Sequence, residues 1–353
     1  MTEGAAPRSC ASCDETGCAM NGRHRVDAPP AARIAYVMDD VWPEYASMIA
    51  ASLREEDQLL APGLLGARPG RYRWPGPARH AAALATVRRH LAMRRVANAS
   101  GGVRQQAYLA ADRIVARTLA KRIDYRAGHL VVAQAWLPWL DEAGMLGGRS
   151  YDVAMSRYPF AEIHRLLEEA AAELGSSATI ADFRAEATLV DRESELLARA
   201  RRIVTPHHGI ASLFPGRAQM LAWHRPPPRN PAAGNRIAFL GPTIARQRPD
   251  IARKLTAGMD EPLIAFGPIL ESLWDDVEIE RRALGPGWLD GIGAILHPAT
   301  MTHQPRHLLE AVANGVPIYA TSTCGLAPDD YMPIGRFRAR ERAAPLVTSA
   351  TAS

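Results

Sequence analysis

Apolar residues in the second half of the chain form short runs that alternate with segments of helical spacing. The runs predict four buried strands, at Arg236–Leu240, Leu263–Phe266, Ala294–His297 and Val316–Thr321. Between the last two strands, apolar residues recur every three or four positions, which predicts a helix over about Pro305–Asn314. Gly315 stands where a left-handed C-cap would end this helix. Strand, helix and strand in this order predict parallel strands in an α/β sheet.

The first half of the chain shows a similar alternation. Its apolar runs predict strands at Ile34–Met38, His129–Gln134, Asp152–Met155 and Ile203–Thr205. Helical spacing predicts helices at Val103–Ile123, Phe160–Leu174 and Arg192–Arg202, and the pattern from Glu44 to Arg126 is mostly helical. The length of 353 residues suffices for two such series. We therefore predict an α/β protein with two Rossmann-like domains.

Proline marks the boundary between the two series. The segment HRPPPRNPAAGN, residues 224–235, cannot continue a helix or a central strand. It is predicted to link a first domain, 31–223, to a second domain, 236–332. Residues 1–30 are small, polar and cysteine-containing, and read as a separate appendage. The Arg- and Ala-rich end, 333–353, has no core pattern and is predicted to fray.

Positive charge is concentrated in one region. The net charge is +5, yet residues 68–126 hold 13 Arg and one Lys against two Asp, a local excess of +12. Such a region can face an anionic acceptor, a nucleic acid or a membrane surface. The alternative is a solvated helical surface, because nearly every basic residue of this chain is Arg. No apolar run is long enough to span a membrane and the first residues lack a signal-peptide layout, so we predict a cytoplasmic protein.

One segment carries a resemblance to a known family. Residues 287–326 contain HPA, then LLEAVANGVPI, then a turn at Gly325. In this the segment resembles the nucleotide-sugar half of retaining glycosyltransferases of the two-Rossmann (GT-B) type. The resemblance implies a hexosyltransferase-type enzyme that takes a sugar from a nucleotide-sugar donor, while the first domain binds an acceptor that it does not identify.

The resemblance places the donor diphosphate after the first strand of the second domain. There the family has a glycine-containing loop with a basic pair, and this chain has Gly241, Arg246 and either Arg248 or Lys254 at comparable positions, with Thr243 in the same loop. Pro249 suits the first turn of a helix, whose free N–H groups and positive dipole end favour a phosphate. The alternative is that these arginines only cover the start of the helix.

Further donor contacts are implied around the predicted helix 305–314. The family's glutamate before Ala usually contacts the ribose, which assigns Glu310 to this role. A buried Glu without a partner would be costly, which also favours a ligand contact. The family's first glutamate lies eight positions earlier, where this chain has Thr302, so the paired-glutamate signature is absent. Thr302, His303 and Gln304 are predicted to hydrogen-bond the sugar or a phosphate from their loop.

His207 is the candidate catalytic residue of the first domain. It follows the predicted strand Ile203–Thr205, and α/β sheets bind ligands in a crevice at the carboxyl ends of their strands. An imidazole there can act as a base or as a hydrogen-bond donor. A helix-capping role is the alternative. Retaining transfer needs no strong protein base if the donor phosphate helps to deprotonate the acceptor.

The N-terminal appendage contains a candidate metal site. Four ligand-type residues fall within 15 positions, namely Cys10, Cys13, Cys18 and His24. Their spacing resembles a zinc knuckle and suits tetrahedral zinc. An iron–sulfur cluster with a fourth ligand from elsewhere, or a tail without metal, are the alternatives. A second functional hypothesis follows, a non-catalytic GT-B-fold protein that binds nucleic acid through this appendage and the Arg-rich region.

Overall fold

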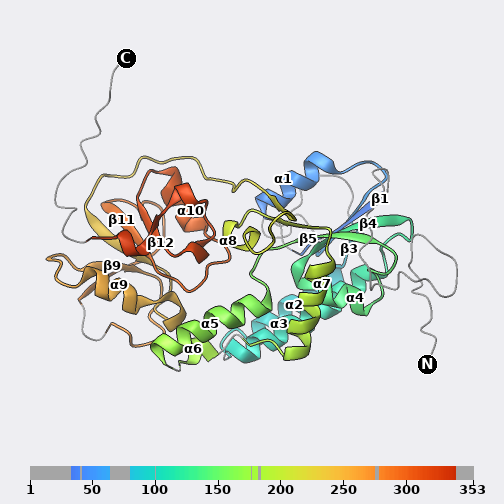
Figure 1. Cartoon of the computed structure of the whole chain (residues 1–353), viewed down its shortest axis with the longest axis horizontal. Helices are drawn as coiled ribbons and strands as arrows, with labels where there is room; N and C mark the ends of the chain where they lie inside the picture. Colours follow the sequence, from blue (N-terminus) through green and yellow to red (C-terminus); the bar gives the residue numbers. More distant parts are fainter. Residues whose placement is uncertain are drawn as a thin grey trace, which may run out of the picture. The chain divides into compact units, whose positions relative to one another are not determined.

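A computed structural model describes residues 33–39, 42–63, 80–99, 101–175, 177–181, 184–274 and 278–338. These residues form two compact units, each built on its own parallel sheet (Figure 1). The first unit runs to Arg165 and resumes over Ala181–His224. The second contains Leu166–Ile180 and the chain from Arg225 onward. The prediction of an α/β fold with two Rossmann-like domains is confirmed.

The first sheet has seven parallel strands in the order β3-β2-β1-β4-β5-β6-β7. In chain order they are β1 (Arg33–Val37), β2 (Gln58–Ala61), β3 (His80–Ala81), β4 (Ala127–Ala133), β5 (Ser150–Ala154), β6 (Arg202–Thr205) and β7 (Ala218–Met220). The four strands predicted for this half correspond to β1, β4, β5 and β6. The mostly helical pattern predicted from Glu44 to Arg126 is wrong at β2 and β3, because runs as short as QLLA and HA have no period that distinguishes strand from helix.

Helices cover the two faces of this sheet unequally. The helices that begin in the first unit are α1 (Pro43–Ser52), α2 (Ala83–Arg95), α3 (Gly101–Ala120), α4 (Leu137–Glu142), α5 (Phe160–Leu174), α7 (Ala187–Arg199) and α8 (His208–Ala211), with the short α6 (Ala178–Ala181) between α5 and α7. Figure 1 shows α2, α3, α4 and α7 on one side of the sheet and α1 on the other. The predicted helix Val103–Ile123 is α3, but Ile114, expected on its apolar side, is 50% exposed.

The second sheet has six parallel strands in the order β10-β9-β8-β11-β12-β13. In chain order they are β8 (Arg236–Leu240), β9 (Leu263–Phe266), β10 (Ile279–Arg282), β11 (Ile292–His297), β12 (Ile318–Ala320) and β13 (Met332–Pro333), with α9 (Pro249–Thr256) and α10 (Arg306–Ala313) between them. The chain proceeds from β8 to one side of the sheet and returns beside β8 with β11. The point between β8 and β11 is therefore the topological switch point, where α/β sheets bind ligands.

Aromatic side chains form the core of the second unit. Phe239 is fully buried and stands edge-on to Trp274 at a ring distance of 5.3 Å. Phe337 is 1% exposed and packs edge-on against Tyr319 at 5.1 Å. The prediction that the chain frays from residue 333 is therefore wrong as far as Phe337, because burial of one aromatic ring anchors the segment. Residues 339–353 lie outside the described part of the chain.

Candidate functional site

Two loops meet at the switch point of the second sheet. One follows β8 and begins at Gly241, and the other follows β11 and leads to α10. The backbone N–H of Thr300, in the second loop, donates to the carbonyl of Arg246, in the first, at 2.9 Å. The loop residues predicted to bind the donor, from Gly241 to His303, therefore belong to two adjoining loops at one edge of the sheet.

Glycine permits the close approach of the strand ends at this edge. Gly241 and Gly267, which follow β8 and β9, have φ angles of +121° and +104° that favour glycine. A Cβ atom on Gly267 would lie 2.8 Å from the carbonyl oxygen of Gly241. At these two turns, backbone therefore packs directly against backbone. The edge beside β8 exposes peptide groups there, because neither glycine has a side chain.

A histidine–threonine pair fastens the loop after β11. His297 is the last residue of β11, and its Nε2 lies 2.6 Å from Thr302 Oγ1. Burial lowers the pKa of His297 from 6.5 to about 4, so the imidazole is neutral at pH 7. The Thr302 N–H donates to the carbonyl of Thr323 at 3.1 Å. At the position of the family's first glutamate, this chain therefore has a hydroxyl that is hydrogen-bonded to a buried neutral histidine.

The basic residue before α9 is engaged with acidic side chains. Arg248 has a left-handed φ of 58° and pairs with Asp250 at 3.0 Å and with Glu173 at 2.7 Å. Burial alone would lower the pKa of Arg248, but the contacts with Asp250 and Glu173 raise it above its ordinary value. Asp250 also adds negative charge to the first turn of α9. The arrangement fits the alternative in which Arg248 covers the helix start, and it disfavours a phosphate there.

Thr243 holds the loop after β8 in place. Its side chain is buried, and Oγ1 accepts a hydrogen bond from Trp274 Nε1 at 2.7 Å. Two residues later, the N–H of Ala245 donates to Glu271 Oε2 at 2.6 Å. The Arg246 side chain is half-buried beside these anchored residues. Thr243 thus supports the loop from inside, whereas Arg246 reaches its surface.

The start of α10 differs from that of α9 in charge. Its first turn carries Arg306 and His307 and no acidic residue, and among the described residues no side chain caps it. His303 precedes this turn in the loop from β11, where it is half-buried. N–H groups at a helix start together with the guanidinium of Arg306 suit an anion. Of the two helices that follow the switch point, α10 therefore has the more favourable N-terminus for a phosphate.

Glu310, in the second turn of α10, has partners within the protein. Trp288 Nε1 donates to Glu310 Oε2 at 3.0 Å, and Arg229 Nη1 lies 3.4 Å from Oε1. The Glu310 side chain is 18% exposed. The premise that a buried Glu310 would lack a partner is thus wrong. Its carboxylate retains lone pairs that can accept hydrogen bonds from a ligand.

His207, the candidate base, lies inside the first unit. Its ring has no exposed surface, and Nδ1 accepts a hydrogen bond from the N–H of Ile210 at 3.1 Å at the start of α8. The ring also stands edge-on to Tyr158 at 5.0 Å. The contact with Ile210 fits the helix-capping alternative. A fully buried imidazole does not reach a substrate.

The predicted metal ligands lie near the N-terminus, and the predicted nucleic-acid surface is the Arg-rich region. Cys10, Cys13, Cys18 and His24 lie outside the described residues, and within the described ones no cluster of His, Cys, Asp and Glu could hold a metal ion.

Part of the Arg-rich region is neutralised internally, because Arg89 pairs with Asp39 and Asp112 while Arg113 and Arg117 pair with Glu142. These pairs reduce the charge available to nucleic acid. None of the described helices combines the length and hydrophobicity of a membrane span.

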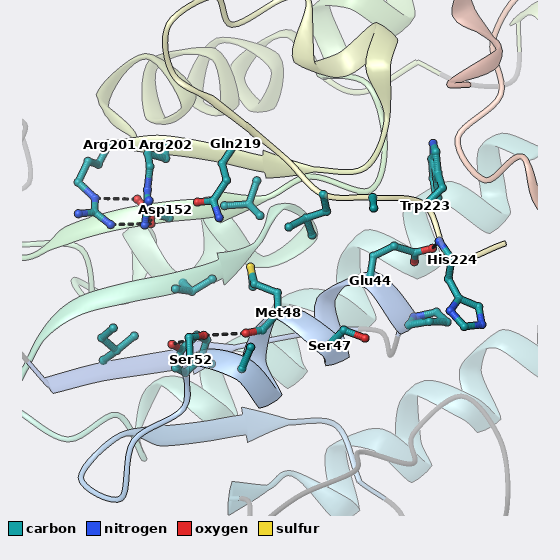
Figure 2. Close-up of a pocket in the computed structure, with 18 of the residues that line it drawn as sticks. Glu44, Ser47, Met48, Ser52, Asp152, Arg201, Arg202, Gln219, Trp223 and His224 are labelled. Carbon is teal, nitrogen blue, oxygen red and sulfur yellow. Dashed lines mark hydrogen bonds and ion pairs between the residues drawn. The ribbon is translucent and has the colours of Figure 1, made fainter. Parts of the chain in front are cut away.

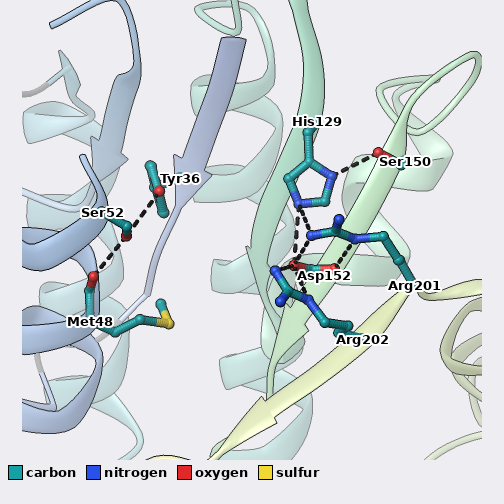
Figure 3. A network of polar contacts seen from close by, with 8 residues as sticks. All are labelled: Tyr36, Met48, Ser52, His129, Ser150, Asp152, Arg201 and Arg202. Atoms are coloured by element: carbon teal, nitrogen blue, oxygen red, sulfur yellow. Dashed lines mark hydrogen bonds and ion pairs between the residues drawn. The ribbon is translucent and has the colours of Figure 1, made fainter. Parts of the chain in front are cut away.

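A buried polar network in the first sheet was not predicted from the sequence (Figure 3). Asp152, on β5, accepts hydrogen bonds from Arg201 and Arg202, each at 2.8 Å, and lies 3.3 Å from His129 Nε2. His129 Nδ1 lies 2.7 Å from Ser150 Oγ. The only signal in the sequence is an acid inside an otherwise apolar strand run, which does not reveal its partners.

Ser150, His129 and Asp152 are the residue types of a hydrolytic triad. Ser150 is only 1% exposed, so a substrate does not reach its hydroxyl. The carboxylate of Asp152 is shared with two guanidinium groups rather than reserved for the imidazole. The geometry therefore argues against nucleophilic catalysis by Ser150.

Comparisons with known proteins do not assign a function to this chain. No protein-family model matches this sequence, and no curated protein matches it. Similar solved structures include the lipopolysaccharide outer core galactosyltransferase WaaB in its apo form, with 10% identity over 86% of this chain and 87% of that chain and a TM-score of 0.45. WaaG, a glycosyltransferase involved in lipopolysaccharide biosynthesis, has 15% identity over 83% and 82% with a TM-score of 0.41. Os79 from O. sativa in complex with UDP has 14% identity over 83% and 82% with a TM-score of 0.46.

Proposed function

We propose that this protein is a glycosyltransferase-like enzyme of the hexosyltransferase type that binds a nucleotide-sugar at the carboxyl-terminal edge of its second sheet. The observation that carries the proposal is the switch point between β8 and β11, where two adjoining loops contain most of the residues that the sequence motif implies for the donor. The motif LLEAVANGVPI forms α10 and leads into β12 beside this point. Fold alone does not assign a reaction, so the proposal depends on these residues.

The donor diphosphate is assigned to the start of α10 rather than to that of α9. Arg306 and the N–H groups of the first turn supply positive potential there, whereas the first turn of α9 carries the negative charge of Asp250. A helix N-terminus contributes about 0.3–1 kcal/mol to an anion and up to about 2 kcal/mol when partly buried. Arg246, on the facing loop, is the second cation that we assign to the diphosphate.

Glu310 is assigned to the ribose and Thr302 to the loop that carries the sugar. The Glu310 carboxylate, oriented by Trp288, has lone pairs for ribose hydroxyls. In the retaining reaction, an acceptor oxygen bonds to the anomeric carbon while the bond from that carbon to the phosphate oxygen breaks. The acceptor proton passes to the departing phosphate, so no protein base is required, which is consistent with the buried position of His207.

Isothermal titration calorimetry with UDP, GDP, ADP and dTDP tests the donor site. Arg306→Ala should weaken the best-bound nucleotide about tenfold, because a hydrogen bond to a charged group contributes about 1.5–3 kcal/mol and about 1.4 kcal/mol is tenfold in affinity. Glu310→Gln should weaken nucleosides and nucleotides alike. Arg281→Ala is the matched control, since Arg281 is an exposed arginine on β10, at the edge of the sheet. Unchanged affinities in both site variants would exclude this donor site.

A further inference from the structure

A pocket of about 640 Å³ lies against the less covered face of the first sheet, beside α1 (Figure 2). Its floor is formed by side chains of neighbouring strands, including Tyr36, Val131 and Val204. The core cluster on this face joins these strands to α1 and to no other described helix. Parallel sheets normally have both faces covered, so a single ten-residue helix leaves part of this face open.

The walls of this pocket are largely apolar and incompletely covered. Ile34, Met48, Leu221 and Trp223 pack against the buried cluster but are themselves only partly buried. In Figure 2, Met48 projects from α1 toward the sheet. Burial of such surface by an apolar group is favourable because it removes apolar area from water. The apolar walls of the pocket therefore favour a ligand with an apolar part that covers them.

One end of the pocket is positively charged. Arg201 and Arg202 both bind the single carboxylate of Asp152, which leaves a net charge of +1 when His129 is neutral (Figure 3). Burial alone would raise the pKa of Asp152, but hydrogen bonds from His129 and the two arginines lower it far below its ordinary range. Asp152 is therefore ionised at neutral pH and holds both guanidinium groups in fixed positions.

The second guanidinium has capacity for another anion. Arg202 uses Nε and Nη2 for Asp152, and its side chain is 47% exposed. Among the described residues that line the pocket, the only other acid is Glu44. Glu44 is buried at a different part of the lining, where its carboxylate accepts the N–H of His224 at 2.8 Å (Figure 2). No described carboxylate of the lining other than Asp152 pairs with Arg202.

We propose that this pocket binds an anionic amphiphile, a molecule with an apolar chain that ends in a carboxylate or a phosphate. The chain would lie along the sheet between Ile34 and Met48, and the head group would contact Arg202 beside Asp152. Guanidinium groups match carboxylate and phosphate oxygens in geometry and charge. Because all lining residues belong to the first unit, this site is separate from the nucleotide site proposed on the second sheet.

Isothermal titration calorimetry with octyl phosphate, octanoate, octyl glucoside and inorganic phosphate, each below its micelle threshold, tests this site. Octyl phosphate or octanoate should bind at least tenfold more tightly than octyl glucoside and inorganic phosphate, and the tighter of the two identifies the head group. Arg202→Gln should weaken that ligand at least tenfold. Met48→Trp, which fills the space beside α1, should abolish binding. Arg88→Gln, an exposed arginine on α2, should leave it unchanged.

Two outcomes would overturn the proposal. Equal binding of octyl glucoside and octyl phosphate would show that the charged end takes no part. Full affinity in Arg202→Gln or in Met48→Trp would place the ligand elsewhere. Far-ultraviolet circular dichroism and the melting temperature of each variant establish that it is folded. Nucleotide affinity measured in the same preparations should not change, so a failure of this site is distinguishable from a failure of the nucleotide site.

Discussion

Acid should destabilise this protein through His297, the buried histidine at the end of β11. The pKa of His297 is about 4 in the folded chain because burial disfavours the imidazolium, against an ordinary value of 6.5. The folded pKa lies below the unfolded one, so the unfolded chain binds the proton first as pH falls. The contribution of His297 is fully present above about pH 6.5 and is lost progressively as pH falls toward 4.

The size of the loss follows from the two pKa values. Their difference corresponds to about 3 kcal/mol in total, of which about 2 kcal/mol is lost between pH 7.5 and pH 5. The free energy of unfolding, measured in urea at these two pH values, should therefore fall by about 2 kcal/mol more in the wild type than in His297→Gln. Glutamine has no titrating group, yet it can still hydrogen-bond the Thr302 hydroxyl.

A matched control and a direct measurement make this prediction refutable. His307→Gln removes an imidazole that is 53% exposed on α10, and it should keep the pH dependence of the wild type. Nuclear magnetic resonance of the folded protein should show the His297 imidazole titrating near pH 4. An identical pH dependence in wild type and His297→Gln, or a titration near 6.5, would show that burial of this ring does not control its proton affinity.

Four further substitutions, one of them a control, test the packing, the turns and a buried ion pair by chemical denaturation. Phe239→Ala should reduce the free energy of unfolding by about 3–5 kcal/mol, because the ring is fully buried and a cavity would remain; a loss below 1 kcal/mol would contradict that packing. Gly267→Ala should reduce the free energy of unfolding by about 1–2 kcal/mol or more, because φ at this position is +104°. Gly285→Ala, where no atom lies within 4 Å of the added Cβ, should reduce it far less. Glu193→Gln should cost about 2–3 kcal/mol through its contact with Arg157 at 2.7 Å; equal stability would mean that this contact is not formed in solution.

Regular elements with a clear pattern could be predicted from the sequence. The strand Leu263–Phe266 and the helix Phe160–Leu174 match their predicted bounds, because an apolar run between a proline and a glycine and a long amphipathic segment are each unambiguous. β2 was missed because its short run lies among helical patterns. The burial of Phe337 was missed because a single aromatic residue in an Arg-rich segment shows no periodicity.

The candidate site was predictable only as far as local sequence determines it. The loop at Gly241 follows a strand, and its place at a ligand-binding edge follows from topology. Trp288, which donates to Glu310, is 22 positions away, and the two arginines that bind Asp152 are about 50 positions away. Such contacts depend on how strands are ordered in the sheet. A charged residue can therefore be recognised in a sequence before it is known whether it faces a ligand or another side chain.

The helix α5 has a consequence for any attempt to isolate one half of this protein. Its residues from Leu166 onward belong to the second unit, although they precede the 224–235 segment by some 50 positions. Glu173 binds Arg248, and the N–H of Thr179 donates to Glu271 at 3.3 Å. A protease that cuts within 224–235 should thus produce two fragments that remain associated on a sizing column. Expression of the first fragment alone would deprive this segment of its partners, so the chain must be studied whole.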